Sequence, residues 1–179
     1  MAMLDQNRLM FGAMLLVLIA IAEIVLHEFN LPAWPVFFVM MFFFLAHMDK
    51  KTAPNIIIGA LVGIGCFIVA RPVIAAIAPI TGIAVGRLLY LLVVVGAIIL
   101  FREKVPMALN DYAFAYLLLS GLASKALPSP HSPFIWMAVT LFGGTIIIFA
   151  ILGIRKIVVA IARKKAIKRA AAAAPPPSL

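Results

Sequence analysis

The chain has 179 residues, of which 66% are hydrophobic and only 12% are charged, and its mean hydropathy is +1.20. Soluble domains are about 45–50% apolar and about 25% charged, so this composition excludes a soluble enzyme, a disordered chain and a disulfide-stapled secreted domain. A membrane-spanning helix needs ~20 apolar residues, so the apolar content is enough for roughly six such helices. The sequence therefore predicts a polytopic membrane protein with little chain outside the bilayer.

Six apolar segments follow one another along the chain, at residues 9–26, 33–46, 56–77, 88–101, 108–122 and 134–154. Short stretches rich in proline and polar residues separate them, and we expect the stretch 78–82 to be the loop after the third segment. The second segment is short for a full crossing, and the fifth begins with the polar residues Asn110 and Asp111. We expect an all-α transmembrane bundle of about six spans over residues 1–154, a basic helical extension over 155–169 and a low-complexity tail over 170–179.

The basic residues are distributed asymmetrically between the two sides of this predicted bundle. With six spans, 12 of the 15 Lys and Arg residues fall on the side of the two termini, and only Arg71, Arg87 and Lys125 fall elsewhere. Basic residues are retained on the cytoplasmic side of membrane proteins, so both termini are predicted to be cytoplasmic. Trp34 and Trp136 then both lie at the outer interface, where indole side chains prefer to sit.

Ionisable residues within apolar segments are costly and need a structural or functional reason. Glu23 and His27 are four residues apart and share one face of the first helix. Two interpretations stay open for the outer half of the bundle: a structural Glu23–Arg71 ion pair, or a polar vestibule or proton-linked site that also includes Arg87. At the inner end, Asp111 is either part of a helix N-cap with Asn110 or a gate at the inner mouth. The candidate polar or transport site is therefore Glu23, His27, Arg71, Arg87 and Asp111.

Catalytic, metal and cofactor sites are not predicted. The sequence has no nucleophile–base–acid set or phosphate-binding loop, and Cys66 is its only cysteine. A zinc site built from Glu23, His27 and His131 is a weaker alternative, because no second closely spaced histidine pair is present. His27 and His47 lie on opposite sides of the predicted membrane and cannot share a haem iron. We therefore expect neither an enzyme nor a resident cofactor.

Two further patterns indicate contacts rather than chemistry. Gly59-x-x-x-Gly63 in the third segment and Gly143-Gly144 in the sixth allow another helix to approach closely. The basic segment after the sixth span is predicted to be a helix that leaves the bilayer and lies over the anionic inner leaflet. It is either a topological anchor without a partner or an electrostatic dock for a protein or a lipid headgroup, and nucleic acid is not expected. Its members are Arg155, Lys156, Arg163, Lys164, Lys165, Lys168 and Arg169.

The layout of the chain resembles that of small bacterial inner-membrane families with six helices. The features that carry this resemblance are Leu31-Pro32-Ala33-Trp34-x-x-Phe37, the glycine-spaced third segment and Val105-Pro106 before the fifth. The chain also looks broadly similar to the substrate-binding subunits of vitamin transporters and to rod-shape membrane proteins. The resemblance implies a multi-pass protein of the cell inner membrane. We expect a small-solute channel or transporter component, with a homo-oligomer or a partner membrane subunit, and the alternative is a non-transporting scaffold or accessory subunit.

Overall fold

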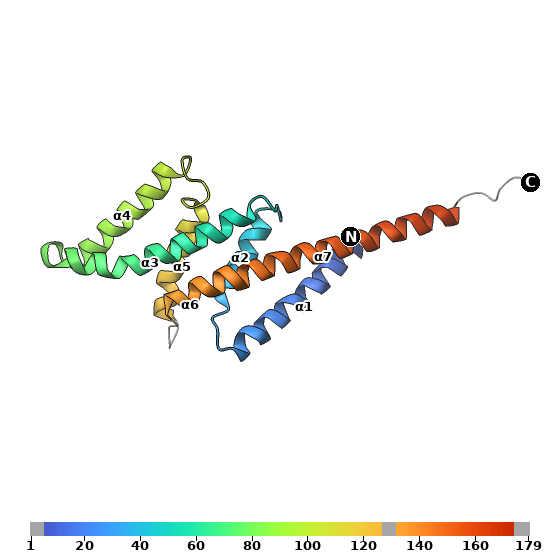
Figure 1. The fold of residues 1–179 in the computed structure, drawn as a ribbon, viewed down its shortest axis with the longest axis horizontal. Coiled ribbons are helices and arrows are strands. Elements are labelled where there is room, and N and C mark those ends of the chain that lie inside the picture. Colours follow the sequence, from blue (N-terminus) through green and yellow to red (C-terminus); the bar gives the residue numbers. More distant parts are fainter. Residues whose placement is uncertain (1–5, 127–131, 174–179) are drawn as a thin grey trace, which may run out of the picture. The chain divides into compact units, whose positions relative to one another are not determined.

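The computed structural model describes residues 6–126 and 132–173, and the side chains of these residues except 166 and 168–173. Every regular element in this part of the chain is helical, as the composition predicts. The elements are α1 (Gln6–Glu28), α2 (Trp34–Leu45), α3 (Ala53–Thr81), α4 (Ile83–Phe101), α5 (Asp111–Ala126), α6 (Pro133–Ala138), the π-helical turn η1 (Val139–Gly143) and α7 (Gly144–Ala173) (Figure 1). The chain divides into two compact units, one of Leu26–Ile148 and one of the described parts of Met1–Val25 and Phe149–Leu179.

Four helical stretches are long and apolar enough to cross a membrane: Gln6–Glu28, Ala53–Thr81, Ile83–Phe101 and Pro133–Lys165. The helix α2 is apolar but has only 12 residues. At 1.5 Å per residue it measures about 18 Å, which is less than the ~30 Å hydrocarbon core of a bilayer. The helix α5 has 16 residues and is not among the four. Helical structure is thus confirmed for all six predicted segments, whereas length and composition sufficient for crossing are found in four.

The helices α3 and α4 form a hairpin within the unit Leu26–Ile148 (Figure 1). The predicted loop at 78–82 is wrong, because α3 includes both Pro72 and Pro79 and continues to Thr81. The turn is reduced to Gly82, whose φ of 81° lies in the left-handed region that glycine adopts without steric cost. Proline interrupts one backbone hydrogen bond in a helix, and long apolar helices tolerate this when neighbouring groups satisfy the freed carbonyl. The hairpin therefore extends an apolar tip beyond the predicted ends of both segments.

The closest helix packing in the same unit joins α3 to α5, and glycine makes it possible. A Cβ atom on Gly63 would lie 2.3 Å from the carbonyl oxygen of Ala113 and 2.9 Å from the backbone nitrogen of Leu117. Any side chain at this position would push the two helix backbones apart. The prediction that Gly59-x-x-x-Gly63 admits a neighbouring helix is confirmed, and that neighbour is α5 of the same chain.

Aromatic side chains from α2, α3, α5 and α6 fill the space beside this helix pair. Trp34 and Trp136 pack edge to face with ring centroids 5.4 Å apart, and the Trp136 ring stacks on Phe67 at 5.8 Å. Tyr116 is fully buried, and its ring centroid lies 5.9 Å from that of Trp34. The two tryptophans therefore pack against each other, and Trp136 is fully buried among helices. Their level at the outer membrane interface stays a prediction.

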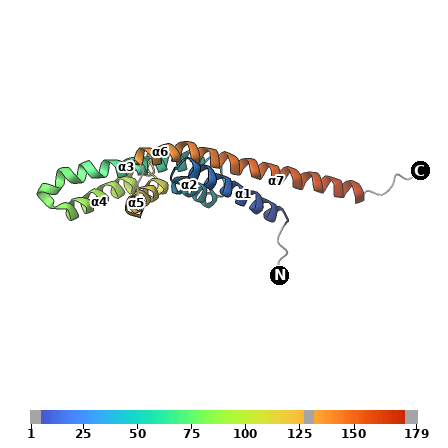
Figure 2. The ribbon, with the colours of Figure 1, turned by 90° about the horizontal axis from the view of Figure 1, so that it is seen from below.

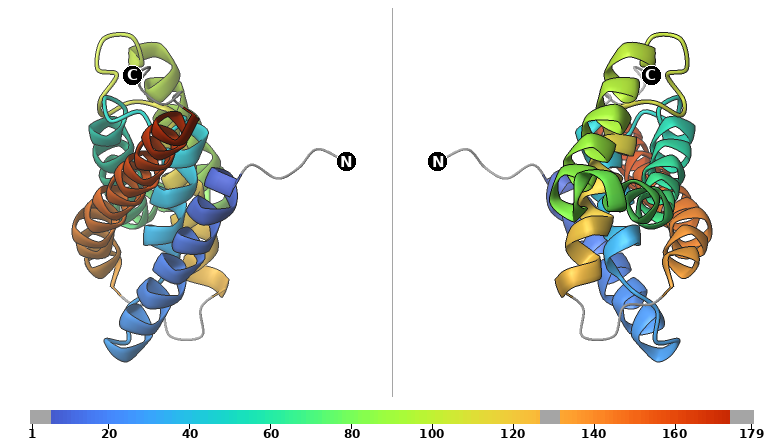
Figure 3. Two further views of the ribbon diagram at one scale, coloured as in Figure 1. Left: turned by 90° about the vertical axis from the view of Figure 1, so that its right-hand side faces the viewer. Right: turned by 90° about the vertical axis from the view of Figure 1, so that its left-hand side faces the viewer.

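The last helix runs on past the end of the predicted sixth segment. The elements α6, η1 and α7 follow one another without a gap from Pro133 to Ala173, and α7 passes through Arg155 without a break (Figure 2 and Figure 3). The basic extension predicted from residue 155 onward is therefore helical as far as Ala173. The helix has no break at residue 155, and the predicted position of this segment over the inner leaflet stays a prediction.

Candidate functional site

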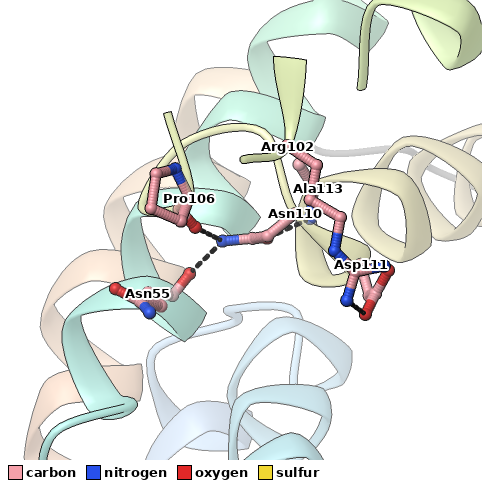
Figure 4. A network of polar contacts seen from close by, with 6 residues as sticks. All are labelled: Asn55, Arg102, Pro106, Asn110, Asp111 and Ala113. Atoms are coloured by element: carbon pink, nitrogen blue, oxygen red, sulfur yellow. Dashed lines mark hydrogen bonds and ion pairs between the residues drawn. The ribbon is translucent and has the colours of Figure 1, made fainter. Parts of the chain in front are cut away.

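The most connected polar group in the described residues is Asn110, which lies just before α5. Its side chain is 8% exposed. Its Nδ2 group donates to the carbonyl oxygens of Asn55 at 3.1 Å and Pro106 at 3.0 Å (Figure 4). It also donates to the carbonyl oxygen of Met107 at 3.1 Å. Its Oδ1 atom accepts a 3.0 Å hydrogen bond from the backbone N–H of Ala113. The helix N-cap predicted from the sequence is thereby confirmed, and the same side chain also ties α5 to the start of α3.

Gly59 is required for this arrangement. A Cβ atom at Gly59 would lie 2.2 Å from Oδ1 of Asn110 and 2.9 Å from its Nδ2 atom. A larger residue would expel the amide from its position against the backbone of α3. The glycine and the asparagine therefore form one structural unit, in which the missing side chain on α3 makes room for the polar side chain that caps α5.

Asp111, the predicted inner gate, takes part in an ion pair. Its Oδ2 atom lies 2.8 Å from the guanidinium of Arg102, which follows the last residue of α4 (Figure 4). Both side chains are more than half exposed, at 71% and 58%. Exposed ion pairs contribute about 0–1 kcal/mol to the free energy of folding, so this pair adds little stability. It links the end of α4 to the start of α5. The carboxylate also lies near the positive end of α5, where negative charge is favourable.

Arg71 and Arg87 lie on the α3–α4 hairpin, away from Asp111. Arg71 is sixteen residues beyond Asn55 on α3, or about 24 Å along the helix. Both arginines are exposed in the isolated chain. The structure therefore brings Asp111 to Arg102 and Asn110 but does not gather Arg71 and Asp111 into one site.

Glu23 and His27 are exposed on α1, where their four-residue spacing places them on one face of the helix. Glu23 belongs to the unit that includes Phe149–Leu179, whereas Arg71 belongs to the unit Leu26–Ile148. The Glu23–Arg71 pair accordingly stays a prediction. His131, the third residue of the weaker zinc alternative, lies outside the described residues. Within residues 6–126 and 132–173, no three His, Cys, Asp or Glu side chains come close enough to hold a metal ion.

The basic segment of α7 contacts the start of α1 within one unit. Arg155, Lys156, Arg163, Lys164 and Lys165 are all exposed, and the Nζ atom of Lys165 donates a 2.6 Å hydrogen bond to Oε1 of Gln6. Lys168 and Arg169 lie on the same helix, but their side chains are outside the described set. This contact places the first turn of α1 at the level of Lys165.

Two polar features could not be anticipated from residue types alone. The hydroxyl group of Tyr116 donates a 2.6 Å hydrogen bond to the carbonyl oxygen of Pro35, and this bond joins α5 to α2. The indole nitrogens of Trp34 and Trp136 are buried without a hydrogen-bond partner. The sequence offers one signal for the Tyr116 bond: a tyrosine within an apolar helix, whose hydroxyl group usually finds a hydrogen-bond partner when it is buried. It does not say which carbonyl group that partner is.

No family model, curated protein or solved structure matches the chain. The class of the protein therefore follows from its own fold. Its described residues are all-helical in their regular structure and include four helices long and apolar enough to cross a bilayer, which indicates a membrane protein.

Proposed function

We propose that the protein is a non-catalytic, multi-pass subunit of a larger assembly in the cell inner membrane. Arg71 carries this proposal. Ten helical residues follow it in α3 before the turn at Gly82, and this tip exposes large apolar side chains, including Ile80, which is 89% exposed. If the apolar tip lies within the membrane, Arg71 lies about 15 Å below the end of its helix and also within the membrane.

An exposed arginine at this depth favours a protein partner. Ionisable side chains inside membranes almost always face a helix bundle or a water-filled cavity, because exposure to lipid costs about 2.5–3.5 kcal/mol near a helix centre on insertion scales. Arg87, on α4, is exposed in the same hairpin. A second membrane subunit, or a second copy of this chain, that packs on the hairpin would give both guanidinium groups polar partners. This is the accessory-subunit alternative that the sequence analysis left open.

The mass of the protein, extracted directly from its native membrane into lipid nanodiscs together with any bound subunit, tests this proposal. We expect the native protein to run as an assembly larger than one chain, and Arg71→Gln and Arg87→Gln to shift it toward a single chain. Lys125→Gln is the matched control, because it removes one exposed basic residue from α5 and leaves the hairpin unchanged. A native protein that runs as one chain, or a loss of assembly that is equal in all three variants, contradicts the proposal.

A small-solute channel or transporter component is the second candidate. The ionisable residues Glu23, His27, Arg71 and Arg87 favour it, because groups of this kind mark solute pathways when they line a water-filled space. Solute flux into liposomes that contain the assembled protein separates the two candidates. Flux that is lost on Arg71→Gln while the assembly persists supports transport, whereas an assembly without flux for small neutral and charged solutes supports the accessory subunit.

A further inference from the structure

Each of the helices α1 and α7 changes from polar to apolar residues, and the contact between them places these two changes at the same level. On α1, the polar residues Gln6, Asn7 and Arg8 precede an apolar run that begins at Leu9. On α7, an apolar run ends at Ala162 and is followed by Arg163, Lys164 and Lys165. The Lys165–Gln6 hydrogen bond joins the outermost residues of these two polar groups. Each polar group spans three residues, so both helices change from polar to apolar about 4.5 Å from the same contact.

The exposed residues at the level of the Lys165–Gln6 contact are basic, and those on its apolar side are large and hydrophobic. On the apolar side of this contact, Leu9 is 57% exposed and Val159 is 59% exposed, and Ile157 and Ile161 are also exposed. At the level itself, Arg8, Arg163, Lys164 and Lys165 are exposed. In the described residues of this unit, the only carboxylate is Glu23, which is seventeen residues from Gln6 along α1. This is the pattern of a membrane interface, with lipid chains against the apolar residues and headgroups against the basic ones.

From this register we infer that Arg8, Arg163, Lys164 and Lys165 form a binding surface for anionic phospholipid headgroups, and that the hydrocarbon boundary on α7 lies between Ala162 and Arg163. Clustered basic residues at a bilayer surface attract anionic lipids, and arginine and lysine both donate to phosphate oxygens. The sequence alone placed this boundary at residue 154. The inference is independent of the assembly proposed above, because it concerns the other unit and a lipid rather than a protein partner.

A consequence is that the basic residues of α7 belong to two different environments. Lys156 lies seven residues before Arg163, or about 10 Å along the helix, on the apolar side of the proposed boundary. The group Arg163 to Lys165 lies among headgroups. The pair Arg155 and Lys156 lies on the hydrocarbon side and, like Arg71, needs polar partners other than headgroups. Only the group Arg163 to Lys165 should therefore determine the lipid preference of the protein.

Two double variants on the same helix test this inference. Arg163→Gln/Lys164→Gln and Arg155→Gln/Lys156→Gln each remove two adjacent positive charges. The measurement is the association of spin-labelled phosphatidylglycerol, relative to phosphatidylcholine, with the full chain in mixed vesicles. We expect the Arg163 and Lys164 substitutions to reduce this preference at least about twofold, since each basic residue near an anionic surface adds several-fold attraction, and the Arg155 and Lys156 substitutions to leave it unchanged. A larger loss with the Arg155 and Lys156 substitutions, equal losses, or no preference in the native protein overturns the inference.

Labelling of single cysteines provides a readout that does not depend on lipid composition. In a Cys66→Ser background, Val159→Cys should resist a membrane-impermeant maleimide, and Lys164→Cys should react with it when the reagent is present on the side of the termini. Rapid labelling of Val159→Cys places the boundary before residue 159 and contradicts the inference. Equal circular dichroism of all variants ensures that the comparison is made between folded proteins.

Discussion

Gly63→Ala tests whether the backbone contact between α3 and α5 holds the helix pair together. The added Cβ atom would lie 2.3 Å from the carbonyl oxygen of Ala113, and real Cβ atoms essentially never approach a heavy atom closer than 3.0 Å. The clash involves backbone atoms on both helices, so rotation of a side chain cannot relieve it. The helices must move apart, and the contacts along α5 are weakened with them.

Gly65→Ala is the matched control for this substitution. It lies two residues further along α3, and a Cβ atom there would meet nothing within 4 Å. Both substitutions add the same methyl group to the same helix and gain about 1 kcal/mol of helix propensity. Only Gly63→Ala adds overpacking, which costs typically about 1–3 kcal/mol. The two variants should therefore differ by about 1–3 kcal/mol in free energy of unfolding, with Gly65→Ala the more stable.

Reversible unfolding in mixed detergent micelles measures this difference. Trp34 and Trp136 report it by fluorescence, because both are part of the aromatic group that packs against α3 and α5. Equal stability of the two variants, or greater stability of Gly63→Ala, would refute the close α3–α5 contact.

Three further substitutions test individual polar contacts in the same unfolding assay. Asn110→Ala should destabilise the fold by about 2–4 kcal/mol, because it removes an N-cap worth ~1 kcal/mol and also leaves buried backbone groups unpaired. Asn110→Ser keeps the cap and should lose less stability. Equal losses for the two variants would contradict the link to α3. Tyr116→Phe should cost about 1 kcal/mol through the lost bond to Pro35, and no change would show that this bond is not formed. Arg102→Gln should cost less than about 1 kcal/mol, and a larger loss or an effect that persists in high salt would contradict the exposed pair with Asp111.

The helices of this protein could be predicted from its sequence because each lies in a long apolar run. The N-cap at Asn110 and the close approach at Gly63 were also predictable, since both depend on local residue types and spacing. The end of α3 was not predictable in this way. Pro79 normally marks the end of a helix in water, but in an apolar environment the cost of an unpaired backbone favours continued helix as far as Gly82.

The contacts between distant segments were beyond the reach of the sequence for a different reason. The Tyr116–Pro35 bond joins residues that are 81 apart, and the Lys165–Gln6 bond joins residues that are 159 apart. Neither pair has a charge or spacing pattern that singles it out among the other polar residues. Likewise, charge counting treated Arg155 and Arg163 as one basic segment, and only the position of α1 distinguishes them.

Photocrosslinking in native membranes shows whether a protein partner covers the α3–α4 hairpin. A photoreactive amino acid is placed at Ala75 or Leu91, which lie one helical turn from Arg71 and Arg87 on the same faces, with Val93 on another face of α4 as the control. We expect protein adducts of discrete mass from Ala75 and Leu91, and lipid adducts from Val93. Lipid adducts alone from all three positions would contradict the proposed partner.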